Sequence, residues 1–320
     1  MHNISQGLRL LGLFFVFGSF LLSTNAFAES YKKVSGISGS INSVGSDTMS
    51  NLMAFWCEGF SKYYPNVRCQ IEGNGSSTAP PALIEGVAQI GPMSRPMKNT
   101  ELDKFEKKFG YKPTSIRTSL DSLVVYVNKD NPLKGLTMSQ VDAIFSRTRR
   151  CGSPRDLVTW GQAGLNGRWA VRPISIYGRN SASGTYGFFK KHALCKGDYK
   201  DTVKEQPGSA SVIQSVSTDL YSIGYSGIGY ITSGVRAIPL AKNAGSSFVK
   251  ATVDNVLNGS YPLGRFLYIY VNKAPNEGLG PLVREFVKFI LSEEGQKIVI
   301  KDGYDPLPSS ISTEELASIK

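Results

Sequence analysis

The sequence predicts an α/β protein of two lobes, and three observations support this prediction. Strand-like apolar runs alternate with helix-like runs along the chain, a pattern that is typical of layered α/β folds. Removal of an N-terminal signal segment of 28 residues leaves 292 of the 320, a length for which two domains are the usual expectation. Two similar strand-like segments, separated by 131 residues, indicate that the chain passes from one lobe to the other and returns.

The first 28 residues are expected to be a secretory signal peptide. Arg9 precedes an uncharged apolar run, Leu10–Leu22, and the tripeptide AFA at 26–28 fits a small-x-small cleavage site. The run has 13 residues, fewer than the roughly 18 to 20 that span a bilayer, which disfavours the alternative of an N-terminal membrane anchor. We therefore expect residues 29–320 to be exported as a soluble chain.

Strand and helix signals follow in order through the first part of that chain. Residues 39–47 read as a strand and a loop, and 48–64 read as a helix whose apolar face is formed by Leu52, Phe55, Trp56 and Phe60. Further elements are expected as a strand at 66–73, a loop at 73–79, a short helix at 80–87, and a strand with a loop at 88–95. Prolines suit the start of the short helix, because the first helical N–H groups need no intrahelical partner.

Two later segments also predict helices. In residues 136–145, the tetrapeptide Thr-Met-Ser-Gln at 137–140 fits a capping box. Residues 280–304 predict a pair of amphipathic helices near the end of the chain.

The two similar segments are DSLVVYVNKDNP (121–132) and GRFLYIYVNKAPN (264–276). Their flanking sequences do not match, which argues against a tandem repeat. If they are two crossings between lobes, lobe 1 contains residues 29–122 and 266–320, and lobe 2 is the continuous insertion 123–265. Interfaces between lobes are preferred places for small-ligand sites.

The composition narrows the possible ligands. Residues 29–320 contain 35 basic and 25 acidic residues, so their formal net charge is +10. A basic exported protein can bind nucleic acid, anionic surfaces or small anions. The basic residues are scattered without a run of five, so we expect no nucleic-acid partner, and small anions remain open.

The four cysteines favour disulfides, because an exported chain meets an oxidising environment. Three pairings are possible, and the nearest-neighbour pairing, Cys57–Cys69 with Cys151–Cys195, is preferred here. No CxxC or CxxH spacing occurs, so neither a metal site nor a cofactor is expected. His192 is the one histidine outside the signal segment and is expected on a helix surface, which lowers the expectation of an enzyme.

Four loops rich in small and hydroxyl residues carry the functional signal. They are VGSDTMS (44–50), GNGSSTA (73–79), GPMSR (91–95) and GRNSASGT (178–185). Helix N-terminal N–H groups, glycines and hydroxyls together form anion pockets, although one such loop alone is ordinarily a helix cap with its turn. The loops fall on both predicted lobes. With no Walker A or strand-linked GxGxxG pattern, they suit a small oxyanion.

Several motifs resemble those of the periplasmic phosphate-binding proteins of bacterial phosphate ABC transporters, the PstS-type family. These motifs are SVGSDTM, GNGSS, IGPMSR, GRNSASGT, SIGYSGIGY and FILSEEGQKIVIKDGYDPLP, and the resemblance covers nearly all of residues 29–320. It implies a type II solute-binding fold, in which each lobe is a mixed sheet flanked by helices and two hinge strands join the lobes. It also implies a periplasmic monomer that captures inorganic phosphate in the interlobe cleft and delivers it to membrane permease subunits.

The resemblance also implies a set of phosphate ligands. Carried onto this chain, it comprises Ser46, Asp47, Thr48, Ser76, Ser94, Arg179, Ser183, Gly184 and Thr185. Two departures stand out, because well-known members have an aspartate where this chain has Ser94 followed by Arg95, and another where it has Ser181.

The missing carboxylate bears on selectivity. Phosphate at neutral pH carries a proton that a buried carboxylate can accept, whereas unprotonated sulfate would meet a desolvated like charge. Asp47 is the one acidic residue in the four loops. We hypothesise that it replaces the family's aspartate, and the alternative is that it caps the helix starting near Thr48.

The two arginines have separate expectations. Arg179 is expected to neutralise the anion through its planar fork, with a surface salt bridge as its alternative. Arg95 could be a second cation near the anion or a latch between lobes. Tyr225 and Tyr230 are expected to pack in the core and hinge.

Three other functions compete with phosphate capture. The same fold could bind sulfate, molybdate or arsenate. A secreted phosphatase with Ser46 or Ser183 as nucleophile would need a base or a metal near that serine. A surface protein could have kept the fold for adhesion.

Overall fold

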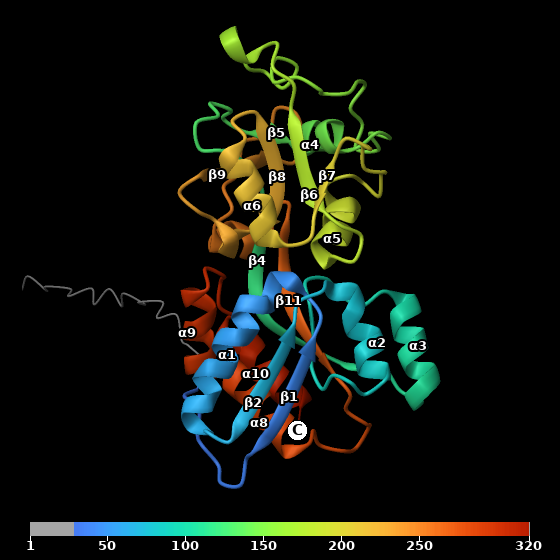
Figure 1. Cartoon of the computed structure of the whole chain (residues 1–320), viewed down its shortest axis with the longest axis vertical. Helices are drawn as coiled ribbons and strands as arrows, with labels where there is room; N and C mark the ends of the chain where they lie inside the picture. Colours follow the sequence, from blue (N-terminus) through green and yellow to red (C-terminus); the bar gives the residue numbers. More distant parts are fainter. Residues whose placement is uncertain (1–28, 320) are drawn as a thin grey trace, which may run out of the picture.

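The computed structural model describes residues 29–319, so the expected signal peptide lies outside the described residues. Figure 1 shows two lobes, one above the other, with strands β4 (Thr114–Asn128) and β11 (Gly264–Val271) running through their junction. Within residues 29–319, none of the helices combines the length and the apolar composition that a membrane crossing requires.

Lobe 1 is built from both ends of the chain. Its helical elements are η1 (Asp47–Met49), α1 (Ser50–Tyr63), η2 (Ser76–Thr78), α2 (Ala79–Ile84), α3 (Asn99–Phe109), α8 (Pro281–Leu291), α9 (Glu293–Lys301) and α10 (Ser309–Ser318). Its strands β1 (Gly39–Val44) and β2 (Val67–Glu72) pair in parallel, and β3 (Gly91–Met93) lies antiparallel to β11. A parallel bridge from Ser43 to Ile90 links the two groups of strands.

Lobe 2 follows one continuous stretch of chain. Its helical elements are α4 (Met138–Phe145), η3 (Gly167–Trp169), α5 (Gly184–His192), α6 (Ser209–Thr218), η4 (Ile228–Tyr230) and α7 (Val253–Leu257). Its strands are β5 (Leu136–Thr137), β6 (Ser175–Arg179), β7 (Lys204–Gln206), β8 (Ser222–Gly227), β9 (Val235–Ala237) and β10 (Leu240–Ala241). The central sheet continues through it in the order β4-β8-β6-β7, with β9 also paired to β4.

Strand β4 changes partner at the junction. Its first part, Thr114–Ser122, is antiparallel to β11, and its second part, Leu123–Val127, is antiparallel to β8. It begins seven residues before the segment that the sequence predicts, at Thr114 rather than Asp121. Because β4 and β11 are antiparallel, their similar Tyr-Val-Asn-Lys endings lie at opposite ends of the sheet.

Each lobe has its own hydrophobic core. One cluster draws residues from Tyr31 to Ile116 and from Leu267 to Ile319, and a second draws residues from Leu123 to Leu263. Side chains alternate between faces along a strand, so Leu123, Val125 and Val127 of β4 enter the second cluster while their neighbours Val124 and Tyr126 pack under α6. We use the names lobe 1 and lobe 2 for the parts of the chain that surround these two clusters.

Several predicted elements are confirmed, and one detail is wrong. The late helix pair is α8 and α9, and Thr137 with Gln140 forms the capping box of α4. In α1, Leu52, Trp56 and Phe60 are buried as expected, but Phe55 is only half-buried and Met53 takes the fourth core position. Met53 lies one residue from Leu52 on the helix, so the buried stripe is wider than the expected face.

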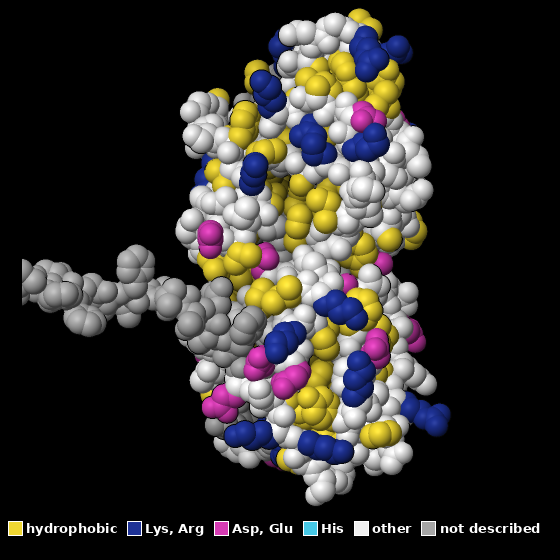
Figure 2. All heavy atoms as spheres, turned by 90° about the vertical axis from the view of Figure 1, so that its left-hand side faces the viewer, with side chains coloured by type: hydrophobic (Ala, Val, Ile, Leu, Met, Phe, Trp, Pro, Cys, Tyr) yellow, Lys and Arg dark blue, Asp and Glu magenta, His cyan; other side chains and the backbone are white. Residues whose placement is uncertain are grey.

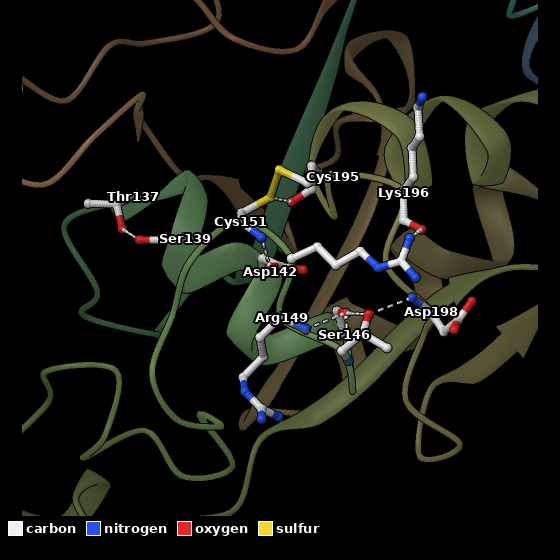
Figure 3. The surroundings of a disulfide bond; sticks show 12 residues. Thr137, Ser139, Asp142, Ser146, Arg149, Cys151, Cys195, Lys196 and Asp198 are labelled. Atoms are coloured by element: carbon white, nitrogen blue, oxygen red, sulfur yellow. Dashed lines mark hydrogen bonds between the residues drawn. A yellow bond between two sulfur atoms is a disulfide. The ribbon is translucent and has the colours of Figure 1, made fainter.

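Two disulfides join Cys57 to Cys69 and Cys151 to Cys195, the pairing that the sequence favours. The first ties α1 to β2 within lobe 1. The second ties the loop after α4 to the end of α5 in lobe 2. Figure 3 shows that the Cys151 N–H donates to the Asp142 carboxylate, at 2.6 Å. This bond anchors the loop against the buried helix α4.

Candidate anion-binding site

The four loops singled out in the sequence meet at the junction of the lobes. Thr48 Oγ1 lies 2.9 Å from Thr185 Oγ1, so the first and fourth loops touch across the lobes. Ser76 Oγ lies 3.2 Å from Ser94 Oγ, which joins the second and third loops. A Cβ added to Gly184 would lie 2.3 Å from Ser76 Oγ and 2.6 Å from Ser94 Oγ. Gly184 therefore has no Cβ for a steric reason: lobe 1 hydroxyls occupy that space.

Helix starts converge at the same place. The 3-10 turn η1 leads directly into α1, η2 leads into α2, and α5 begins at Gly184. Ser183 caps α5 by accepting hydrogen bonds from the N–H groups of Thr185 and Tyr186, at 3.1 and 3.3 Å. The first N–H groups of a helix lack intrahelical partners and carry the positive end of its dipole. The junction is therefore rich in donors that suit an anion.

The glycine-rich second loop lets the backbones of the two lobes touch. Gly75 has φ +106°, a left-handed conformation that favours glycine, and a Cβ there would lie 2.6 Å from the Ala182 carbonyl oxygen. The N–H of Ser77, two residues further on, donates to the same oxygen at 3.1 Å. The lobes are thus closed on each other in this structure.

Arg179 ends β6 and points its guanidinium to the junction. Its side chain is 1% exposed, so its alternative as a surface salt bridge is wrong. Nη1 lies 3.0 Å from Asp47 Oδ2 and donates to Ser209 Oγ at 2.7 Å, and Nη2 donates to the Pro207 carbonyl at 3.1 Å. Nε is buried without a hydrogen-bond partner among the described residues. A donor is therefore left over after the protein contacts are counted.

Asp47 bridges the lobes instead of capping a helix. Its Oδ2 accepts from the N–H and the hydroxyl of Ser209, at 2.8 and 2.9 Å, in addition to pairing with Arg179. The residue at the cap position of η1 is Ser46, and no side chain makes a capping bond there. The capping alternative for Asp47 is therefore wrong, because its carboxylate is drawn to the cation and donors of lobe 2.

The expected site residues are almost all removed from solvent. Ser46, Thr48, Ser76, Ser94, Arg179, Ser183 and Thr185 are 0 to 3% exposed, and Gly184 is buried. Asp47 is the exception, with 22% of its side chain exposed. Buried hydroxyls normally have hydrogen-bond partners, and Thr48 and Thr185 are partners of each other across the lobes.

A second arginine at the site was not expected from the sequence. Arg265, in β11, places Nε and Nη2 at 2.8 and 2.7 Å from Asp121 Oδ2 in β4. It also donates to the Ser94 carbonyl at 2.9 Å and to Thr185 Oγ1 at 3.0 Å. One sequence feature could have indicated this pair. Asp121 and Arg265 are the charged residues at the start of the two similar strand segments, and they are opposite each other in the β4–β11 register. Ser209, at the start of α6, had no such signal.

Three tyrosine hydroxyls hold the loops in place. Tyr230 donates to the Asp47 carbonyl at 3.0 Å, Tyr304 donates to the Thr48 carbonyl at 2.8 Å, and Tyr225 accepts the Arg179 N–H at 3.1 Å. Burial raises the pKa of each of these three hydroxyls above its usual value. They therefore act as neutral hydrogen-bonding groups at any physiological pH.

Arg95 faces the junction but pairs within its own lobe. Its two Nη atoms each donate to one carboxylate oxygen of Glu101, both at 2.7 Å. Burial works to raise the pKa of Glu101, but the hydrogen bonds from Arg95 and from the Lys98 N–H, together with the charges of Arg95 and Lys98, lower the pKa overall. Arg95 Nη2 also donates to Ser77 Oγ of the second loop, at 3.2 Å. Among the described residues its ion pair is with Glu101, so it is not an ion-pair latch to lobe 2.

The described residues do not form a metal site or an activated serine at the junction. Within residues 29–319, no cluster of three or more His, Cys, Asp or Glu side chains could hold a metal ion. His192 is the last residue of α5, where it stacks on Phe188 at a ring distance of 4.3 Å, as expected for a helix surface position. It makes no hydrogen bond to Ser46 or Ser183 that would activate a serine nucleophile.

Comparisons with known proteins agree with this architecture. A model described as the PBP superfamily domain matches residues 32–294. The chain is 58% identical over 289 residues to the phosphate-binding protein PstS of Pseudomonas aeruginosa, with 90% of each chain covered. It is 29% identical over 273 residues to protein SphX of Synechococcus elongatus, covering 84% of this chain and 78% of SphX.

Solved structures give the same result. A putative phosphate ABC transporter substrate-binding protein from Clostridium perfringens, with bound phosphate, superposes with a TM-score of 0.71 at 28% identity, covering 84% of this chain and all of that chain. An ABC-type phosphate transport receptor from Vibrio cholerae has a TM-score of 0.63 at 23% identity, covering 83% and 100%, a likeness that bears on the fold alone. The fold is therefore the two-lobed type II binding-protein fold, and the chain belongs to the PBP superfamily and, within it, to the PstS family of phosphate-binding proteins.

Proposed function

We propose that this protein captures inorganic phosphate between its lobes and delivers it to the membrane permease subunits of an ABC transporter. The observation that carries the proposal is the meeting of Thr48, Ser76, Ser94, Gly184 and Thr185 at one buried junction beside Arg179. The Pseudomonas relative bears the name of a phosphate-binding protein, and the Clostridium structure contains phosphate. The protein acts by binding, so it is not an enzyme.

The closed arrangement of the lobes explains how phosphate binding is coupled to a conformational change. A ligand favours closure only through contacts that the open form does not offer. Lobe 1 contributes Thr48, Ser76 and Ser94, and lobe 2 contributes Gly184 and Thr185, so an ion held by both sets stabilises the closed form. A permease can then distinguish the loaded protein from the empty one by the relative position of the lobes. We place this capture in the periplasm, by a monomeric exported chain.

Each side chain has a distinct role in this proposal. Arg179 supplies a positive charge and the free Nε–H, while hydroxyls and helix N–H groups replace the hydration shell of the ion. Asp47 uses Oδ2 for Arg179 and Ser209, and its Oδ1 makes no hydrogen bond to a described residue. We assign to Oδ1 the acceptance of the phosphate O–H, which sulfate cannot offer.

Titration calorimetry on residues 29–320, stripped of bound ligand, tests the function. We expect one phosphate per chain, competition by arsenate, and sulfate affinity lower by about 10-fold to 100-fold, because each unmatched buried hydrogen bond to a charged group costs about 1.5 to 3 kcal/mol. Nitrophenyl phosphate should remain uncleaved with and without divalent metals. Absence of phosphate binding, or equal affinity for sulfate, would contradict the proposal.

A further inference from the structure

A polar cavity lies beside the buried meeting point of the four loops, at Thr48, Ser76, Ser94, Gly184 and Thr185, which we call the inner site. Its volume is about 470 Å³, and residues of both lobes line it. Ser183, which caps α5, lies in its wall, as does Ser77, which follows Ser76. The cavity therefore adjoins the inner loops without containing Thr48, Ser76, Gly184 or Thr185.

The wall of this cavity is strongly basic. It contains Arg95 and Lys98 from lobe 1 and Lys190, Lys191 and Lys196 from lobe 2, and no aspartate or glutamate. Two of these charges are compensated nearby, since Arg95 pairs with Glu101 and Lys190 lies 3.0 Å from Asp198.

The other three lysines are uncompensated. Lys98, Lys191 and Lys196 make no ion pair with a carboxylate among residues 29–319. All three are exposed. Since no carboxylate of the described residues pairs directly with them, their ammonium groups are available to ions in solution.

The position of these lysines on opposite lobes has an electrostatic consequence. Closure brings Lys98 to the same cavity as Lys191 and Lys196, and like charges brought together repel unless an anion lies between them. A cleft lined by one sign of charge also raises the local concentration of oppositely charged ions and their association rate, by 10-fold to about 10³-fold. Most basic residues elsewhere lie scattered over both lobes, as Figure 2 shows for one face. The three cavity lysines differ because they line one cavity from both lobes, beside the inner site.

We propose that this cavity, defined by Lys98, Lys191 and Lys196, is an outer anion-binding site that collects phosphate at the mouth of the cleft and passes it to the inner site. This inference rests on the proposed function, because it assigns a rate-setting role to groups that do not touch the inner site. The lysines act on the association rate constant, and the inner loops with Arg179 set the dissociation rate constant.

Stopped-flow measurement of phosphate binding to residues 29–320 tests the role of the outer site, with the change in intrinsic tyrosine and tryptophan fluorescence as the signal. The test variant replaces Lys98, Lys191 and Lys196 together by glutamine. The ionic strength is about 10 mM, where the Debye length is about 30 Å and charges act over long distances. We expect the association rate constant of the variant to fall by about tenfold and its dissociation rate constant to change by less than twofold. Raising the ionic strength should lower the association rate constant of the native chain and leave that of the variant nearly unchanged.

The matched control replaces Lys107, Lys134 and Lys250 by glutamine. These residues are exposed, lack ion pairs, divide between the lobes in the same proportion, and lie outside the cavity. An equal slowing in the control would assign the effect to total charge and overturn the proposal, as would a change confined to dissociation or an unchanged association rate. If the native chain fails to bind phosphate at all, the proposed function fails; if it binds and the test variant associates normally, only the outer site fails.

Discussion

Two aspartate–arginine pairs flank the inner site, and they differ in what they connect. Asp47 and Arg179 belong to different lobes, whereas Asp121 and Arg265 belong to the two neighbouring strands β4 and β11. Opening the lobes must separate the first pair and leaves the second intact. The same chemistry therefore performs two functions, one reversible and one permanent.

The hydrogen bonds of the two pairs differ in the same way. In the β4–β11 pair, Arg265 uses Nε, Nη1 and Nη2, and Asp121 also accepts the Ile228 N–H at 3.2 Å. In the interlobe pair, Arg179 keeps a buried Nε without a partner. A completed network holds a structure together, whereas a buried donor left over is where a ligand can gain energy. The comparison indicates which arginine meets the ion.

The largest expected effect follows from removing the interlobe cation. Arg179→Gln should weaken phosphate binding by about a thousandfold, or about 4 kcal/mol, because the ion and Asp47 would both lose a buried charged partner. Titration calorimetry measures the affinity, and thermal unfolding shows whether the fold persists. Arg179→Lys keeps the charge but loses the planar guanidinium, so its phosphate affinity should lie between those of the native chain and the glutamine variant. Near-native affinity in the glutamine variant would remove Arg179 from the site.

Breaking the β4–β11 pair should act on stability first. Asp121→Asn leaves the Arg265 guanidinium buried without its counter-charge, which costs about 3 kcal/mol of unfolding free energy. Urea unfolding measures this loss. The matched variant Asp47→Asn should lose less than about 1 kcal/mol, because opening of the lobes exposes Arg179 to water and the Asp47 side chain is already partly exposed. Equal losses in the two variants would mean that the pairs are not functionally distinct.

The Asp47→Asn variant should instead change ligand choice. We expect about tenfold weaker phosphate binding and a smaller ratio of phosphate to sulfate affinity, because the amide cannot act as an acceptor only. Competition calorimetry with the two anions measures both quantities. Unchanged discrimination would end the assignment of Asp47 as the acceptor of the phosphate proton.

Asp302, a third carboxylate near the junction, shows how burial without a cation changes the pKa of an aspartate. Burial raises the pKa of Asp302 to about 7, and no ion pair with it is formed within residues 29–319. Between about pH 4 and pH 7 the folded chain therefore binds more protons than the unfolded chain, so its stability falls as the pH rises through this range. The variant Asp302→Asn should lack the part of this loss of stability that comes from Asp302.

Urea unfolding of both chains at pH 5 and pH 8 measures the Asp302 effect. The native chain should lose more stability between these values than the variant does. Asp305, whose pKa burial and the nearby Asp121 raise to about 6, remains in both chains and serves as the internal reference. Parallel pH profiles would show that Asp302 does not contribute.

The sequence predicted the local parts of the site and missed the long-range ones. Hydroxyl and glycine residues at helix starts are recognisable within a few positions, which is why Thr48, Ser76 and Gly184 could be named as site residues. Asp121 with Arg265 depends on strand register over 144 residues, and Ser209 reaches Asp47 over 162 residues. No local pattern encodes such contacts, because a strand or helix signal does not identify its partner.

The same division applies to the fold. Alternating apolar runs predicted the strands and helices, and cysteine spacing favoured the observed pairing. The early start of β4 was missed because Arg117 and Asp121 interrupt its apolar pattern. Arg117 pairs with Glu314 and Glu315 of α10, and Asp121 pairs with Arg265. Tertiary partners satisfied charges that, in the sequence, were typical of a loop.

The insertion of one lobe within the other constrains the order in which the protein can be completed. A chain that emerges N-terminus first has every strand of lobe 2 available once Leu263 has appeared, and Cys151 can already meet Cys195. Lobe 1 must wait for β11 and for helices α8, α9 and α10. Until then β4 has an unpaired edge along Thr114–Ser122, a surface to which another strand could add. Translocation that stalls between these two points would leave a molecule with one finished half, no cleft and an exposed strand edge.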